Sequence, residues 1–166
     1  FAAERVGPSG RVVGIDFTVE QLEKARKIAD EGGYSQVELR EGRIEDLPVE
    51  DAGCNCVISN GVINLAPEKE RVFGEAARVL KPGGRLAIAD IVSEQQLKES
   101  IVCDADLWAS CIGGAAQEAA YREAIEAAGL RIEQVRANPY EFISERAVDA
   151  SAKYGVKSVS VLAFKP

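Results

Sequence analysis

The sequence predicts a Rossmann-like α/β fold, with a mostly parallel sheet, helices on both of its faces and an antiparallel strand pair at the C-terminal end. Short apolar runs rich in β-branched residues alternate with segments whose apolar residues recur at helical spacing. That alternation is typical of parallel sheets, and two successive strand-like runs near the C-terminus predict the antiparallel pair. The 166 residues are enough for one domain and too few for two, so we expect a single domain over residues 1–166.

The first half of the chain is expected to begin inside a helix, at residues 1–7, and then to hold strands at 11–16, 37–40 and 54–59. The apolar character of the third strand predicts burial on both of its faces. Thr18 is expected to cap the helix between the first two strands, with Gln21 as its capping-box partner, and Gly32–Gly33 to end it.

The second half is expected to continue the alternation. In order, its segments are a helix from Pro67, a turn over Lys81–Gly84, a strand over 85–90, a less regular helical insertion over 93–116, a helix over 117–128, and strands over 130–135 and 157–164 joined by a long connection around 140–155. Proline in the first turn and glycine after the last turn are the boundary signals for these helices.

Composition excludes several classes of partner. The formal net charge is −7, from 27 acidic and 20 basic residues, and no run of Lys or Arg breaks this balance, so we expect no nucleic-acid or membrane partner. The four cysteines form no CxxC pair, which favours a reducing, cytoplasmic location over a disulfide framework. Because the chain has no histidine, a histidine base and a histidine metal ligand are excluded, and we expect no metal site.

The fold class itself indicates where a ligand binds. In open parallel sheets, ligands bind outside the carboxyl ends of the strands, at the point where the strand order reverses. The segments expected at that edge are Asp16–Thr18, Gly42–Glu45, Ser59–Asn64 and Asp90–Ser93. We therefore expect the functional site among these four segments.

Two interpretations stay open for each polar segment. A carboxylate at the position of Asp16 can accept both hydroxyls of a ribose, or it can stabilise the following helix through the helix dipole. The acidic turn over 41–48 can hold the edge of an adenine or simply be solvated. Asn60 begins a polar turn, and Asn-Gly turn chemistry explains it without any function.

Cys111 is the candidate for acceptor chemistry. It lies close to Trp108 in the insertion expected to cover the cleft, where a thiolate can bind a soft metal or metalloid. The alternative is a small, inert, buried side chain, which is what we expect of Cys54, Cys56 and Cys103.

Several stretches together resemble the class I S-adenosylmethionine-dependent methyltransferases of the ubiquinone/menaquinone-biosynthesis type. They are Val12–Thr18, Gly42–Pro48, Val57–Leu65 and Arg78–Leu86. The closest likeness is to the arsenite methyltransferase-like branch, and it rests on the Asn-xxx-Asn-Leu run at 60–65, on Gly42-x-Ile44-Glu45, and on the stretch from Trp108 to Gly114 that contains Cys111. The resemblance extends from about residue 1 to the end of the chain.

The resemblance implies S-adenosylmethionine as the cofactor and a role for each matching residue. Asp16 would hold the ribose hydroxyls with Thr18 in the same cofactor site, Phe17 would pack on the adenine, Ile44 and Glu45 would hold the adenine edge, Asn60 and Val62 would line the floor, and Cys111 would bind the substrate. It also implies a methyl transfer without a metal, to a small-molecule or metalloid acceptor of which arsenite is one candidate.

The same resemblance implies that the domain is incomplete at its N-terminus. The family's first strand and its Gly-rich loop, which cradle the methionine moiety, should precede Phe1, and the chain does not begin with Met. That strand would lie centrally, between those that end at Asp16 and Ser59, so two inner edges would carry unpaired backbone groups. We expect the sheet to close over this gap or a second copy of the chain to fill it, as a homodimer.

Two other functions stay open. A nicotinamide-dependent oxidoreductase would use Asp16 equally well, with its glycine fingerprint before Phe1, although the turn over 81–85 and the terminal strand pair favour the methyltransferase. A non-catalytic fragment or interaction module would keep the same fold without the cofactor loop.

Overall fold

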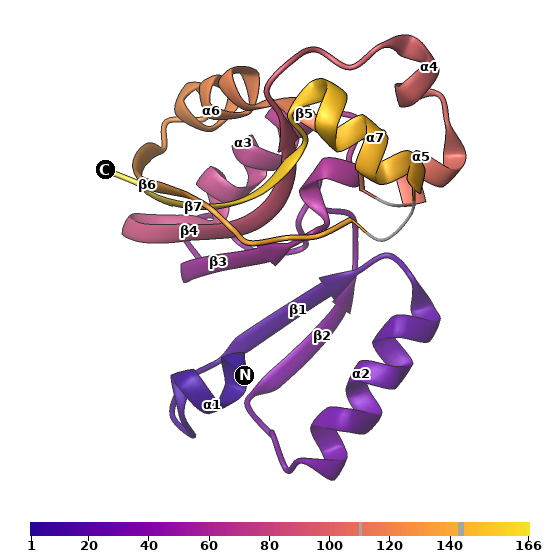
Figure 1. Cartoon of the computed structure of the whole chain (residues 1–166). Coiled ribbons are helices and arrows are strands. Elements are labelled where there is room, and N and C mark those ends of the chain that lie inside the picture. The colour runs from indigo at the N-terminus through magenta and orange to yellow at the C-terminus, as the bar shows by residue number, and fades with distance from the viewer. Residues whose placement is uncertain (110, 143–144) are drawn as a thin grey trace. The chain divides into compact units, whose positions relative to one another are not determined.

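The structure is a computed structural model that describes residues 1–109, 111–142 and 145–166. The chain divides into two compact units, an N-terminal unit over Phe1–Val49 and a C-terminal unit over Glu50–Pro166. Each unit has its own β-sheet, and Figure 1 shows the course of the chain through both. The single domain expected over residues 1–166 stays a prediction.

The N-terminal unit is built around a two-stranded parallel sheet. Its elements are α1 (Ala2–Val6), β1 (Val12–Asp16), α2 (Val19–Glu31) and β2 (Val37–Glu41). The two strands pair in parallel, from Val12 with Val37 to Asp16 with Glu41, and α2 is the crossover between them (Figure 1). The buried residue of α2 is Leu22, one of the apolar positions at which the sequence pattern places a helix.

The capping box expected at the start of α2 is wrong. Thr18 occupies the N-cap position, but its side chain makes no capping hydrogen bond. Instead, the backbone N–H of Thr18 donates to Oδ1 of Asp16 over 2.8 Å, and its carbonyl accepts from the N–H of Gln21 over 3.1 Å. The carboxylate two residues earlier therefore orders the backbone at this helix start, in place of the hydroxyl.

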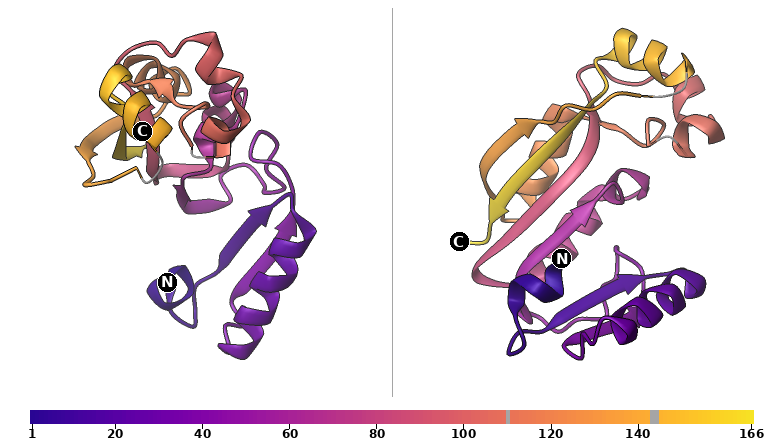
Figure 2. Two further views of the ribbon diagram at one scale, coloured as in Figure 1. Left: turned by 45° about the vertical axis from the view of Figure 1, so that its right-hand side comes forward. Right: turned by 60° about the horizontal axis from the view of Figure 1, so that its bottom comes forward.

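The C-terminal unit combines a mixed sheet with several helices. Its elements are β3 (Cys54–Asn60), the 3₁₀ turn η1 (Ile63–Leu65), α3 (Lys69–Val79), β4 (Leu80–Ser93), α4 (Glu99–Val102), α5 (Ala105–Ala109), β5 (Ala116–Gln117), α6 (Glu118–Ala127), β6 (Arg131–Ala137), α7 (Glu145–Tyr154) and β7 (Lys157–Phe164). The strand order is β3–β4–β7–β6, and β5 also pairs with β4. β3 and β5 run parallel to β4, whereas β7 is antiparallel to both β4 and β6 (Figure 2). The antiparallel pair expected at the C-terminal end is confirmed.

The core of this unit is formed where α3 and α6 pack against each other and on β4. The apolar stripe of α3 is buried, and its residues are Val72, Phe73, Ala76 and Val79, continued by Leu80. Phe73 meets Tyr121 of α6 edge to face, with 5.1 Å between the ring centroids. This packing fixes α3 and α6 relative to the strand whose end carries part of the candidate site.

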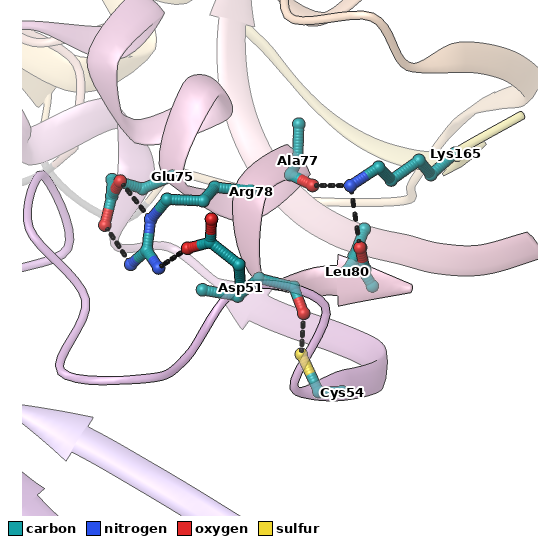
Figure 3. Close-up of polar contacts among 8 residues, drawn as sticks. Asp51, Cys54, Glu75, Ala77, Arg78, Leu80 and Lys165 are labelled. Atoms are coloured by element: carbon teal, nitrogen blue, oxygen red, sulfur yellow. Dashed lines mark hydrogen bonds and ion pairs between the residues drawn. The ribbon is translucent and has the colours of Figure 1, made fainter. Parts of the chain in front are cut away.

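The C-terminal end of α3 is held by side chains from other elements, as Figure 3 shows. Nζ of Lys165, which follows β7, donates to the carbonyls of Ala77 and Leu80 over 2.8 Å each. Sγ of Cys54 lies 3.2 Å from the carbonyl of Val79. The last carbonyls of a helix have no partner within it, so these side chains supply the donors that the helix lacks.

The turn expected over Lys81–Gly84 lies inside β4. Leu80 already pairs with β3, and the regular ladder resumes at Arg85. Gly83 turns the backbone with φ of +77°, and its N–H donates to the carbonyl of Lys165 over 2.8 Å. The turn residues therefore become part of one long strand, because β3 pairs with Leu80 and Arg85 on either side of them and Lys165 bonds to two of them.

β3 is more exposed than expected. Ile58 is 58% exposed and Cys56 is exposed, because β3 is the last strand in its sheet's order and pairs, within the described residues, with β4 alone. Cys103 is exposed as well, at the end of the short surface helix α4, whereas Cys54 and Cys111 are partly buried. The expectation of buried side chains is therefore wrong for Cys56 and Cys103.

The connection expected around 140–155 contains a helix, α7, which the sequence pattern did not predict. Ala147, Ala150 and Tyr154 are its buried residues, and they join a second apolar cluster with Leu107 of α5 and Ile112. The helical insertion expected over 93–116 is confirmed as α4 and α5. Residue 110 of that insertion and residues 143–144 of the connection lie outside the described residues.

Candidate functional site

The expected cofactor residues of the N-terminal unit gather at one edge of its sheet. β1 and β2 point the same way (Figure 1), Asp16 pairs with Glu41, and the N–H of Gly42 donates to the carbonyl of Asp16 over 3.1 Å. The segments after the two strands therefore lie side by side at the carboxyl edge, as the fold class predicts. These segments carry the five expected residues Asp16, Phe17, Thr18, Ile44 and Glu45.

Asp16 is oriented by the helix that follows it. Its Oδ1 accepts the hydrogen bond from the backbone of Thr18, which fixes the direction of the carboxylate. A carboxylate accepts about four hydrogen bonds, so this local role leaves capacity for a ligand. Both interpretations of Asp16 from the sequence are therefore compatible with its geometry.

Phe17, Ile44 and Glu45 lie in the segments that follow β1 and β2 at the same edge of the sheet. The Phe17 ring is 72% exposed, which is unusual for a large apolar side chain between a strand and a helix. Ile44 and Glu45 are half-buried, and a carboxylate oxygen of Glu45 lies 3.6 Å from Nε of Arg43. An oriented carboxylate beside an exposed aromatic ring suits a ligand that has both hydroxyl groups and a flat ring.

The expected residues of the C-terminal unit meet at the end of β3. Asn60, the last residue of the strand, is exposed, and Gly61 turns the chain with φ of +67° while its N–H donates to the carbonyl of Ala89 over 2.8 Å. Val62 follows with 45% of its surface exposed. Residues 60–62 therefore form a turn anchored on β4, which we call the β3 turn.

Cys111 lies against the β3 turn. Its Sγ is 3.9 Å from the carbonyl oxygen of Gly61, its N–H donates to the carbonyl of Trp108 over 2.9 Å, and its own carbonyl accepts from Nδ2 of Asn64 over 2.7 Å. The backbone of Cys111 has φ of +62°, a value that few residues other than glycine adopt. The structure thus brings Cys111 to the turn that carries Asn60 and Val62, although Cys111 follows Asn60 by 51 residues in the sequence.

A buried polar network supports this arrangement. Asp90, only 2% exposed, accepts at Oδ2 from the backbone N–H of Asn64 over 2.9 Å and from the hydroxyl of Tyr121 over 3.1 Å, and at Oδ1 from the N–H of Ile91 over 2.9 Å. Burial raises the pKa of the Asp90 carboxyl, while these hydrogen bonds and the charge of Lys69 act in the opposite direction. The network joins η1, through Asn64, to the C-terminal part of β4.

The sequence predicts that Asn64 and Asp90 lie at the carboxyl edge of the sheet, but no sequence pattern indicates a role for either residue. Asn64 is fully buried, and within the described residues its Oδ1 has no hydrogen-bond partner. The available sequence signal was a polar residue ending each apolar run. That signal locates such residues but does not reveal their partners.

Two kinds of site are not found in the part of the chain that the structure describes. No group of three or more Cys, Asp or Glu side chains there could hold a metal ion. None of the described helices combines the length and the apolar character needed to cross a bilayer.

Comparison with known proteins decides the family. The model of a family described as a methyltransferase domain matches residues 1–129. The chain belongs to the methyltransferase family. The arsenite methyltransferase of Halobacterium salinarum is 39% identical over 99% of this chain and 43% of its own length, and the human arsenite methyltransferase is 40% identical over 68% of this chain and 32% of its own length.

A solved structure agrees with these relatives. The arsenic(III) S-adenosylmethionine methyltransferase of Chlamydomonas reinhardtii superimposes with a TM-score of 0.79 and 30% identity, over 98% of this chain and 57% of that one. The chain is therefore a class I S-adenosylmethionine-dependent methyltransferase of the arsenite methyltransferase-like branch, as the resemblance implied. S-adenosylmethionine is the cofactor of this family, and the family favours methyl transfer over the nicotinamide chemistry kept open above. The chain spans less than half the length of the two arsenite methyltransferases just named.

Proposed function

We propose that the protein to which this methyltransferase chain belongs transfers a methyl group from S-adenosylmethionine to arsenite. The observation that carries this proposal is the Cys111 thiol held against the β3 turn, in a chain whose relatives include arsenite methyltransferases. Trivalent arsenic is a soft acceptor of thiolate ligands, so a thiol at this position suits it better than it suits an oxygen or carbon acceptor.

The N-terminal unit supplies the nucleoside end of the proposed cofactor site. Asp16 accepts the ribose hydroxyls with the oxygen capacity that the Thr18 backbone leaves free, and the exposed Phe17 ring packs on the adenine. Ile44 and Glu45 hold the edge of the adenine from the segment that follows β2. For the C-terminal unit, Asn60 and Val62 of the β3 turn are the residues that we propose for cofactor binding.

Binding and orientation are the chemical work that falls to the residues of this chain. When bound, S-adenosylmethionine would supply an electrophilic methyl group, to which the lone pair of the acceptor bonds in line while the carbon–sulfur bond breaks and S-adenosylhomocysteine leaves. Because no proton relay or metal is needed, much of the rate comes from holding the acceptor in the right place. Cys111 does this for arsenic through a sulfur–arsenic bond, formed as hydroxide leaves the arsenite with the thiol proton as water.

The test is methylation of arsenite by the full-length protein and by its Cys111→Ser variant. We expect the variant to lose at least about 100-fold in kcat/KM for arsenite, because serine forms no comparable bond to arsenic. Cys56→Ser is the matched control, since Cys56 is exposed near the start of β3, away from the β3 turn, and should retain activity. Equal activity of the Cys111→Ser variant and the wild type would exclude arsenite binding at this thiol.

A further inference from the structure

The backbone of Cys111 has a conformation that needs support. Its φ of +62° belongs to the left-handed region, where a residue with a Cβ is strained by about 1 kcal/mol or more. Such a conformation persists only when surrounding contacts hold it. It also decides where the thiol points, because the direction of Cα–Cβ follows from the backbone.

A hydrogen bond from Asn64 fixes the backbone carbonyl of Cys111. Its Nδ2 donates to the Cys111 carbonyl over 2.7 Å, across 47 positions of sequence, and the Asn64 side chain is fully buried. On the amide side, the N–H of Cys111 donates to the carbonyl of Trp108 in α5, only three residues earlier in the sequence. The Asn64 amide is therefore the contact that fixes the backbone carbonyl of the strained residue to a distant part of the chain.

Asn64 is itself held at a fixed place. Its backbone N–H donates to the buried carboxylate of Asp90, which Tyr121 also bonds. The loop after Cys111 packs directly on it, because a Cβ added at Gly114 would lie only 2.0 Å from the Asn64 carbonyl oxygen. A continuous chain of contacts thus runs from the end of β4 through Asn64 to Cys111.

We propose that Asn64 is a positioning residue, whose amide sets the backbone of Cys111 so that the thiol faces the carbonyl of Gly61 at the β3 turn. This inference rests on the proposed function, because the orientation of the thiol affects activity only if Cys111 binds the acceptor. The orientation itself is independent of any acceptor. It can therefore be measured on the thiol alone.

The test is the alkylation rate of each cysteine by iodoacetamide, resolved by peptide mass spectrometry, in the wild type and in Asn64→Asp. Aspartate keeps the shape and the backbone bond to Asp90 but removes the N–H donor. We expect the Cys111 rate to change by about fivefold, the factor for losing one hydrogen bond, while Cys56 and Cys103 react as in the wild type. Asn138→Asp is the matched control, because Asn138 also donates a hydrogen bond through its side-chain amide, but to the hydroxyl of Ser158 and not to Cys111.

Two outcomes would overturn the inference. An unchanged Cys111 rate in folded Asn64→Asp means that the amide does not orient the thiol, and an equal change at all cysteines means that Asn64 serves only stability. If the aspartate variant does not fold, Asn64→Ala tests the same point without an added charge. In the methylation assay we expect Asn64→Ala to raise KM for arsenite and leave KM for S-adenosylmethionine unchanged.

A failure of the proposed function is distinguishable from a failure of this inference. If Cys111→Ser methylates arsenite normally, the thiol is not the acceptor ligand, whatever the alkylation rates show. If Cys111→Ser is inactive but Asn64→Asp alkylates at the wild-type rate, the proposed function stands and the positioning role is wrong.

Discussion

At the scale of single residues, the candidate site depends on hydrogen bonds that join Asn64 to Asp90 and to Cys111, which are far from it in the sequence. Asp16 and Cys111 were predicted as candidates from a strand end and from an insertion near Trp108, and the structure places each beside other expected residues. Asn64 received no role, because its partners are 26 and 47 residues away and no local pattern encodes them. The same limit applies to Thr18, whose side chain makes no capping hydrogen bond because the Asp16 carboxylate orders the start of α2 instead.

The close packing of the Cys111 loop on Asn64 predicts a strong effect at Gly114. An alanine Cβ there would lie 2.0 Å from the Asn64 carbonyl oxygen, so the backbone must shift. We expect Gly114→Ala to lower the free energy of unfolding by about 1–3 kcal/mol, measured by urea denaturation. Gly74→Ala is the control: a Cβ at this helical position meets nothing within 4 Å, and the variant should gain about 0.5–1 kcal/mol. Wild-type stability of Gly114→Ala would show that the loop is loosely packed.

The lowered pKa of Glu38 predicts that the stability of the N-terminal unit depends on pH. Hydrogen bonds from Arg40 and then Arg11 lower the pKa of its carboxyl from 4.5 to about 2. A lowered native pKa means that the native state binds fewer protons, so the stabilisation is present above pH 4.5 and is lost as the pH falls toward 2. The stability difference between the wild type and Glu38→Gln should therefore shrink from pH 7 to pH 3 in denaturation experiments. A difference that stays constant over this pH range would contradict this assignment.

At the scale of elements, strong periodicity predicted the fold and weak or irregular patterns did not. The helix α3 and the two C-terminal strands lie where the sequence predicts them, because large apolar residues recur there at a clear spacing. α7 was missed because two of its three buried residues are alanines, which give little contrast with polar neighbours. The turn before Arg85 became part of β4 because distant segments bond to it, which a local turn signal does not predict.

The end of α3 offers a test at this scale. Lys165 donates to two carbonyls at the end of the helix, where a positive charge also suits the helix dipole. We expect Lys165→Met to lower the free energy of unfolding by about 1–2 kcal/mol, because the methylene packing is kept while the two bonds are lost. Lys24→Met, on the exposed surface of α2, should change stability by less than about 0.5 kcal/mol. Equal effects of the two variants would show that the end of α3 does not depend on Lys165.

At the scale of the whole molecule, each unit carries a strand with a single partner. Within the described residues, β1 pairs only with β2, and β3 is the last strand of its sheet. Unpaired strand edges favour pairing with another chain. We propose that a second copy of the chain pairs at these edges, and we keep the single domain and the cytoplasmic location as predictions.

Sedimentation velocity of the chain tests this proposal. We expect a dimer whose population increases with protein concentration, because exposed edges pair by mass action. A substitution of Ile58 by Lys on β3 should shift the equilibrium toward monomer, since charged side chains protect exposed edges. A monomer at every concentration would contradict pairing between copies.

The most direct test of the account is calorimetric titration with S-adenosylhomocysteine, the product form of the cofactor, with NAD as the control ligand. We predict micromolar affinity for S-adenosylhomocysteine, about −8 kcal/mol, and none for NAD. Asp16→Asn should weaken binding by about tenfold or more while keeping the acceptor for the Thr18 backbone, and Asp30→Asn, at the other end of α2, should bind as the wild type does. Failure of the folded protein to bind S-adenosylhomocysteine, or equal binding by Asp16→Asn, would contradict the assignment of the cofactor site to the ends of β1 and β2.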